Sequence, residues 1–201
     1  MALTDKLKAI ADAIRSKTDS SDVMTLDEMP EKIAAIEAGS SPTAPYVEET
    51  YDESGNLIGA KLVGHNNVRR AAFDSCTNLA LISLPESITS IGKSAFSNCT
   101  NLVLTSLPES VTSIEQQAFY SCTNLALTSL PESLTSIGKM AFCYCENLVK
   151  LTFKGTPTSI SADAFYNCPE LTVINVPWSE GTVANAPWGA TNATVNYRYG
   201  G

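Results

Sequence analysis

Apolar residues recur along most of this chain at a fixed interval of 23 residues. Five copies of the pattern follow one another without insertion, and a β-branched residue, a phenylalanine and a leucine keep the same place in each. The copies begin at Val68, Ile91, Ile114, Ile137 and Ile160. A fixed period of about 20 to 29 residues predicts a solenoid, in which each copy buries its apolar edge only against its neighbours.

The second copy, residues 91–113, illustrates the elements that each copy predicts. In Asn101–Pro108, a short apolar run that ends at proline indicates a strand. In Gly92–Cys99, helix-compatible residues around an Ala-Phe pair indicate a helical turn. At the junction of copies one and two, the alternating stretch Ser87–Ile91 indicates a second short strand on another side of the coil. We therefore predict an α+β solenoid with short parallel strands, which stack about 4.8 Å apart into a rod roughly 25 Å long.

The repeat pattern also resembles a known family. The consensus I-G-x-x-A-F-x-x-C-x-x-L-x-x-x-x-L-P-x-S-V-x-S resembles the BspA-type leucine-rich repeat over residues 68–182. That family is found mostly in bacterial surface proteins and in some phage or prophage products. The resemblance implies a right-handed leucine-rich repeat coil and a non-enzymatic module for binding or adhesion. The chain departs from the pattern at Lys154, which replaces the repeat proline, and at Trp178–Glu180.

Two threonines stand where an inward aliphatic residue is expected. Copy four places Leu151 and Phe153 on one face of its strand, and in the same register Thr105 and Thr128 of copies two and three turn inward. A local bulge would instead bury the leucines that precede these threonines. Without a bulge, Leu81, Leu104 and Leu127 would form an exposed apolar stripe typical of a protein interface. We favour the bulge, because a buried hydroxyl requires a hydrogen-bond partner.

The outward positions of this strand are the least constrained by packing, so we predict that they form the ligand face. The expected ligand is a protein or a glycan on a host surface. The candidate residues are Ala80, Leu81, Ser83, Val103, Leu104, Ser106, Ala126, Leu127, Ser129, Val149, Lys150, Thr152, Thr172 and Asn175.

Residues 1–38 predict two short amphipathic helices, followed by a linker over residues 39–45. Their apolar residues at helical spacing are Leu7, Ile10, Ile14, Leu26, Met29, Ile33 and Ile36. A helical pair this short cannot bury its apolar stripes alone, so it must fold back on the repeats, self-associate or dock on another protein. The motifs I-A-D-A-I-R-x-K-T and M-T-L-D-E-M-P-E-K-I resemble helical heads of phage and prophage tail-associated proteins of Gram-positive bacteria. That resemblance implies an anchor to virion or tail proteins and a homo-oligomer.

Atypical units are expected at both ends of the repeats, because a solenoid needs caps. Residues 46–67 alternate around Ser54-Gly55-Asn56 and predict a β-hairpin as the N-terminal cap. Residues 177–201 contain Trp178 and Trp188 and predict the C-terminal cap. A role of the two tryptophans in carbohydrate binding is conceivable, but packing suits their position at the end better.

Five of the six cysteines fall in one column of the repeat, at Cys76, Cys99, Cys122, Cys145 and Cys168. Side chains at equivalent positions of stacked copies point the same way, which is the wrong geometry for a disulfide. A metal site is not indicated either, because the chain has one histidine and no paired CxxC motif. We expect free, buried thiols that pack as small apolar groups.

Glu86, Glu109 and Glu132 follow the repeat proline and should stack as a row of carboxylates. Calcium is bound by six to eight oxygens from converging groups, whereas this row offers one carboxylate per copy. We therefore interpret the row as a solvated acidic edge.

Composition excludes several classes of function. The net charge of −8 disfavours binding to nucleic acid, which needs clustered Lys and Arg. The N-terminal sequence has charges among its apolar residues and predicts neither a signal peptide nor a membrane span. No nucleophile elbow or phosphate-binding loop is present, and no catalytic site, metal or cofactor is expected. These features favour synthesis in the cytoplasm and assembly into a virion as a tail-associated recognition protein; the alternative is a bacterial cell-surface adhesin.

Overall fold

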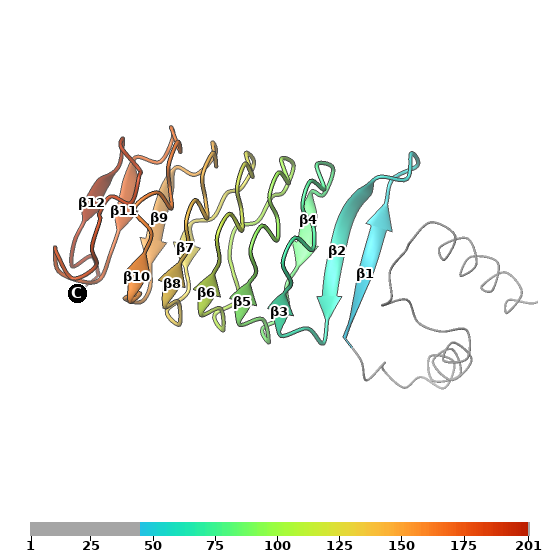
Figure 1. Ribbon diagram of the computed structural model, residues 1–201, viewed down its shortest axis with the longest axis horizontal. Coiled ribbons are helices and arrows are strands. Elements are labelled where there is room, and N and C mark those ends of the chain that lie inside the picture. Colours follow the sequence, from blue (N-terminus) through green and yellow to red (C-terminus); the bar gives the residue numbers. More distant parts are fainter. Residues whose placement is uncertain (1–44, 201) are drawn as a thin grey trace, which may run out of the picture. The chain divides into compact units, whose positions relative to one another are not determined.

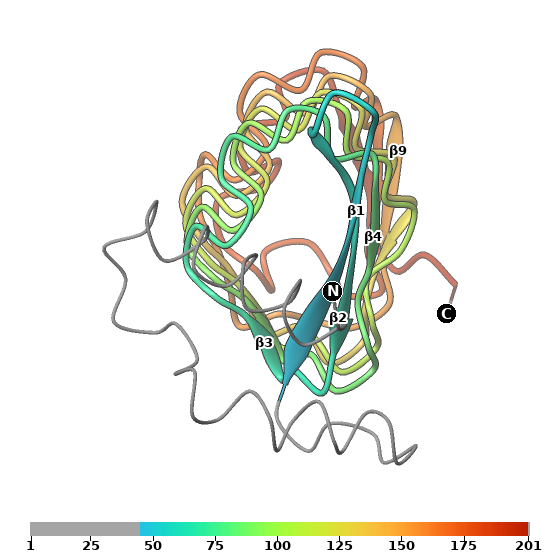
Figure 2. The same cartoon turned by 90° about the vertical axis from the view of Figure 1, so that its right-hand side faces the viewer.

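Each copy makes one turn of a coil, and successive turns stack into a parallel β-solenoid (Figure 1). The structure is a computed structural model that describes residues 45–200. Viewed along the coil, each turn has three sides, and two of them carry short strands (Figure 2). The parallel-strand coil is therefore confirmed. The predicted helical hairpin and its seven apolar positions lie outside the described residues.

The strands of the described residues are short, apart from the first two. They are β1 (Tyr46–Tyr51), β2 (Leu57–Val63), β3 (Asn67–Val68), β4 (Leu81–Ser83), β5 (Ser90–Ile91), β6 (Ser113–Ile114), β7 (Ser129–Leu130), β8 (Ser136–Ile137), β9 (Lys150–Phe153), β10 (Ser159–Ile160), β11 (Val173–Asn175) and β12 (Thr194–Asn196). They form three sheets with the orders β1-β2-β4, β10-β8-β6-β5-β3 and β12-β11-β9-β7. All neighbouring strands run parallel except β1 and β2, which form an antiparallel hairpin.

The second short strand predicted for each copy is confirmed by the sheet that joins β3, β5, β6, β8 and β10. Ser90 pairs with Ser113, and Ser113 pairs with Ser136, so the register follows the repeat without a slip. Threonine hydroxyls just before these strands support the stacking, because Thr112 Oγ1 donates to the Thr89 carbonyl at 3.0 Å and Thr135 Oγ1 to the Thr112 carbonyl at 2.8 Å.

The helical turn predicted on the third side is wrong for the described residues, which contain turns there but no α-helix. Ser94 and Asn98 have φ angles of 54° and 59°, which a right-handed helix does not allow. The backbone bonds also run between copies: Phe96 N–H donates to the Ala118 carbonyl at 2.8 Å. The side is therefore a ladder of tight turns, and the predicted α+β class becomes all-β in residues 45–200.

A ladder of phenylalanine rings fills the centre of the coil. Adjacent rings are nearly parallel, with centroids between 5.2 and 5.4 Å apart. The rings belong to Phe73, Phe96, Phe119, Phe142 and Phe165. Because each ring packs on the copies before and after it, the ladder ties the turns into one core.

On the strand side of the coil, the two threonines place their hydroxyl groups outward. Thr105 and Thr128 are both exposed, and Leu127 is buried in the core. Leu104 is partly buried and packs against the core. The exposed stripe of three leucines is therefore wrong, since only Leu81 of that register is exposed. Copy two, moreover, contains no strand on this side of the coil.

Both ends of the coil differ from the internal copies. At the N-terminal end, Asp52 accepts N–H groups of Ser54 and Asn56 at the turn of the β1–β2 hairpin, and β2 pairs with β4. At the C-terminal end, Trp178 and Trp188 are buried beside Phe153, and Trp188 Nε1 donates to the Ala184 carbonyl at 2.7 Å. Buried indoles in these contacts are packing residues and are not available as a carbohydrate platform.

Candidate functional site

The strand face is the outward side of the coil over β2, β4, residues 102–107, β7, β9 and β11. Three large apolar side chains remain exposed on it, although most large apolar residues of the described chain are buried. They are Leu81, Val103 and Val149, with exposed fractions of 68%, 47% and 56%. A surface that keeps such residues in water on copies one, two and four is typical of a place where a partner binds.

The structure changes the membership of the predicted ligand face. Two of its candidates are buried, Leu127 at 2% exposure and Asn175 at 1%. Leu127 turns inward because Thr128 takes the outward position, and Asn175 accepts a hydrogen bond from Asn196 and donates one to Thr152 Oγ1 at 3.3 Å. Both residues leave the candidate face, and Leu104 remains only partly accessible.

The remaining candidates lie at the surface to different degrees. The exposed ones are Leu81, Ser83, Val103, Ser106, Val149, Lys150 and Thr172, whereas Ala80, Ala126, Ser129 and Thr152 are half-buried. At the C-terminal end of the face, Lys150 Nζ lies 5.9 Å from the ring centroid of Tyr199, which is itself half exposed. Sequence reasoning missed Tyr199, because nothing in the repeat pattern links a residue of the cap to copy four.

The row of glutamates has a structural role as well as its charge. Glu86 accepts the backbone N–H of Glu109 at 3.2 Å, and Glu109 accepts that of Glu132 at 3.4 Å. Lys154 forms an ion pair with Glu109, two copies away, which lowers the pKa of that carboxyl group through their hydrogen bond. Residues 45–200 contain no cluster of acidic, histidine or cysteine side chains arranged to hold a metal ion.

The cysteine column lies against the phenylalanine ladder. The thiol of Cys99 donates to the Phe73 carbonyl at 3.0 Å, and Cys122, Cys145 and Cys168 repeat the contact with the next three phenylalanines. All six cysteines are free thiols. Burial raises the pKa of Cys99 and Cys168 to about 12 and also raises the pKa of Cys122 and Cys145. These groups are structural, because a protonated buried thiol is a poor nucleophile.

We expect the four thiols at Cys99, Cys122, Cys145 and Cys168 to react with a disulfide reagent at least about tenfold more slowly in the native protein than in urea. The raised pKa keeps them protonated at about pH 8, where the thiols of the unfolded chain begin to ionise. The measurement is time-resolved labelling followed by mass spectrometry of peptides. Cys76, which is half-buried, serves as the internal control. Equal rates at all positions would contradict the buried column.

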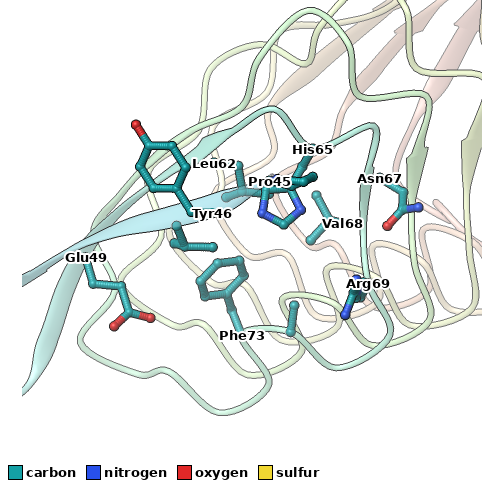
Figure 3. A pocket seen from close by; sticks show the side chains of 11 residues that line it. Pro45, Tyr46, Glu49, Leu62, His65, Asn67, Val68, Arg69 and Phe73 are labelled. Atoms are coloured by element: carbon teal, nitrogen blue, oxygen red, sulfur yellow. The ribbon is translucent and has the colours of Figure 1, made fainter. Parts of the chain in front are cut away.

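A hollow of about 390 Å³ opens at the N-terminal end of the coil, beside the first ring of the ladder (Figure 3). Leu62, Val68 and Phe73 contribute apolar side chains to it, and the ring of His65 points toward them. His65 Nε2 is buried without a hydrogen-bond partner among the described residues. Neither serine nor cysteine lines this hollow, so His65 has no nucleophile to activate there.

Two further hollows lie next to each other on the strand face. One, of about 390 Å³, extends from β1 over β2 to β4, and Gly59, Lys61 and Leu81 are among its lining residues. The other, of about 230 Å³, lies between copies one and two and includes Glu86 and Leu104. Ile82 and Ser83 line both hollows, which are therefore neighbours at β4.

The described residues include no helix with the length and hydropathy needed to cross a membrane.

Comparison with protein families gives one match that covers most of the coil. A model described as the BspA type leucine rich repeat region (6 copies) matches residues 66–186. No curated protein matches the chain significantly.

Solved structures of other leucine-rich repeat proteins resemble this coil. A leucine-rich repeat protein of T. pallidum is 22% identical, with a TM-score of 0.53 and coverage of 79% of this chain and 81% of its own. A leucine rich cell surface protein of Faecalibacterium prausnitzii is 21% identical, with a TM-score of 0.48 and coverage of 80% and 56%. The pneumococcal vaccine antigen PcpA is 19% identical, with a TM-score of 0.44 and coverage of 73% and 43%. This chain spans about half the length of the last two proteins, and identities this low show the fold alone.

Proposed function

Since this chain belongs to the BspA-type leucine-rich repeat family, we propose that it is a non-enzymatic recognition module that binds a protein partner through the strand face. Families of this repeat type serve as interaction modules, and a stacked coil offers an extended surface rather than a closed pocket. The family membership covers residues 66–186, which include every residue of the strand face that lies in copies one to five.

The exposed apolar side chains of Leu81, Val103 and Val149 carry the proposal. On a free surface, a repeat protein has no packing reason to place such residues at equivalent or adjacent positions of copies one, two and four. Serine and threonine hydroxyls surround them at Ser83, Ser106 and Thr152. An apolar centre with a polar rim is the usual composition of a protein interface.

We propose that the protein is displayed on a bacterial cell surface, as in the alternative of a cell-surface adhesin. The support is the family itself, which is found mostly in surface proteins. The tail-associated setting rests on residues 1–38, which lie outside the described residues. An anchoring or oligomerising role of residues 1–38 remains a prediction.

Introducing negative charges at the exposed apolar positions of the strand face provides the test. The full chain would be immobilised and probed by biolayer interferometry with purified fibrinogen, fibronectin, laminin, collagen and mucin. We expect at least one of them to bind, and the double variant Leu81→Asp/Val149→Asp to weaken that binding about tenfold or more, because each aspartate places a charge in a desolvated contact.

Tyr166→Asp is the matched control, because Tyr166 is as exposed as these residues but lies on the turn side. It should leave the affinity unchanged, and both variants should keep the melting temperature of the parent protein. Binding that resists the double variant, or binding lost equally in the control, would refute the strand face as the recognition surface. Failure of all five probes would count against a surface-adhesin role.

A further inference from the structure

The strand face contains a break in its backbone hydrogen bonding between copies one and two. On this side, the Val103 N–H donates to the Ala80 carbonyl at 2.9 Å, and no further backbone bond joins copy two to β4 in the described chain. The N–H groups of the next four residues, Leu104 to Leu107, have no acceptor among residues 45–200. We call residues 82–84 together with residues 104–107 the sheet break.

The break is a local feature and not a property of the repeat. β2 pairs with β4 ahead of it, and β7, β9, β11 and β12 pair continuously behind it. Copy two differs from copy four, because Thr105 is exposed and Leu104 turns partly inward, whereas the equivalent positions of copy four are a buried Leu151 and an exposed Lys150. Copy three has the same side-chain order as copy two, with Leu127 buried and Thr128 exposed, but its Ser129 and Leu130 still pair with β9. The break is therefore confined to copy two.

The two neighbouring hollows of the strand face lie at the break and beside it. The larger one is open beside Leu81 because its neighbour in the sheet, Gly59, has no side chain. The smaller one lies within the break itself, between Leu84 and Leu104. Together they join an apolar surface to backbone groups that are free to form hydrogen bonds, which is the combination that extended peptides recognise.

Charge selects the kind of peptide. Glu48 and Lys61 in the larger hollow neutralise each other through an ion pair at 2.9 Å. Glu86 in the smaller hollow is exposed and has no cationic partner among the described residues. The whole chain carries a net charge of −8. A basic ligand therefore gains more from this groove than an acidic one.

We propose that the sheet break is a docking groove for an extended, basic segment of the partner protein, a proposal that rests on the proposed function. Carbonyl groups of the segment accept hydrogen bonds from the N–H groups of Leu104 and Ser106, which line the smaller hollow. An apolar side chain of the segment enters the hollow above Gly59 against Leu81, and a lysine or arginine pairs with Glu86. The partner is thus recognised partly through its backbone, with the side chains adding selectivity.

Short synthetic peptides test the groove directly on the full chain. The probe is acetyl-Val-Lys-Val-Lys-Val-amide, and the matched probe carries glutamate in place of both lysines. We expect the lysine peptide to bind about tenfold or more tightly than the glutamate peptide in fluorescence anisotropy. Its chemical-shift changes in NMR spectra should centre on residues 82–84 and 104–107. Glu86→Gln should reduce the difference between the two peptides.

The decisive variant closes the groove. Leu104→Lys/Thr105→Leu gives copy two the residue order of copy four, so that the substituted leucine turns inward and copy two pairs with β4. This variant should melt no lower than the parent and bind the lysine peptide about tenfold or more weakly. Gly59→Val is the second variant, because its side chain fills the larger hollow while its Cβ lies at an ordinary 3.5 Å from Thr50 Cβ. Lysine-peptide binding that survives both variants overturns the proposal.

The same variants separate this inference from the proposed function. If Leu81→Asp/Val149→Asp abolishes binding of a whole protein partner and closure of the groove leaves that binding intact, the strand face is the recognition surface and the groove is not its peptide site. If closure of the groove weakens both the peptide and the whole partner, the inference is supported.

Discussion

Replacing Phe119 with alanine should lower the free energy of unfolding by about 3 to 5 kcal/mol, which is the usual cost of truncating a buried phenylalanine. Its side chain has no exposed surface, and its ring packs between those of Phe96 and Phe142 at centroid distances of 5.3 and 5.4 Å. Because the apolar interior of each turn packs only on the turns next to it, a cavity at the middle of the ladder weakens the contact between its two halves. Urea denaturation followed by circular dichroism measures the change.

The control for Phe119→Ala is Tyr166→Ala, which removes an aromatic side chain that is 51% exposed. It should change the stability by no more than about 0.5 kcal/mol. A loss below about 1 kcal/mol for Phe119→Ala would mean that the ladder is not the core of the coil. A transition that splits into two steps would show that the variant has uncoupled the halves of the rod.

Gly155→Ala should destabilise the protein by about 3 kcal/mol, the upper part of the range for overpacking. A Cβ atom at this position would overlap the carbonyl oxygen of Glu132 and lie 2.8 Å from its carbonyl carbon and 2.9 Å from its Cα. These are backbone atoms of the preceding copy, which cannot move without breaking the stacking of the turns. The close approach explains why the column of glutamates after the repeat proline ends with a glycine in copy four.

Gly59→Ala is the matched control for Gly155→Ala, because its added Cβ would meet only ordinary contacts, the nearest at 3.5 Å. We expect it to leave the urea midpoint unchanged or to raise it slightly, as alanine restricts the unfolded chain more than glycine does. Equal effects of the two substitutions would contradict the close contact between copies three and four at Gly155.

The interior of the coil and its strand face have different roles. The phenylalanine and cysteine columns and the close contact at Gly155 hold the coil as a rigid rod. The strand face varies from copy to copy, since Leu81, Val103 and Lys150 lie on the same surface as small hydroxyl residues. A constant interior with a variable exterior lets one repeat architecture present different binding surfaces without a change of fold.

A helical turn was predicted wrongly on the third side of the coil because the prediction relied on local composition. Residues such as Gly92–Cys99 are compatible with a helix, but Ser94 and Asn98 adopt positive φ angles and their neighbours form hydrogen bonds to the next copy. Helix propensity is a weak preference of a few tenths of a kcal/mol per residue, and the bonds between copies outweigh it. No signal within a single copy reveals bonds that exist only when copies stack.

The sequence alone determined the period and the columns of Phe and Cys, because stacked copies of equal length must bury the same positions. It also indicated that Thr105 and Thr128 were anomalous. Only the tertiary structure decided that Leu127 turns in, that copy two lacks a strand, and that a groove opens beside β4. The physical reason is that strands of two to four residues are too short for alternation to set their side-chain directions. The hydrogen bonds to the neighbouring copies set them instead.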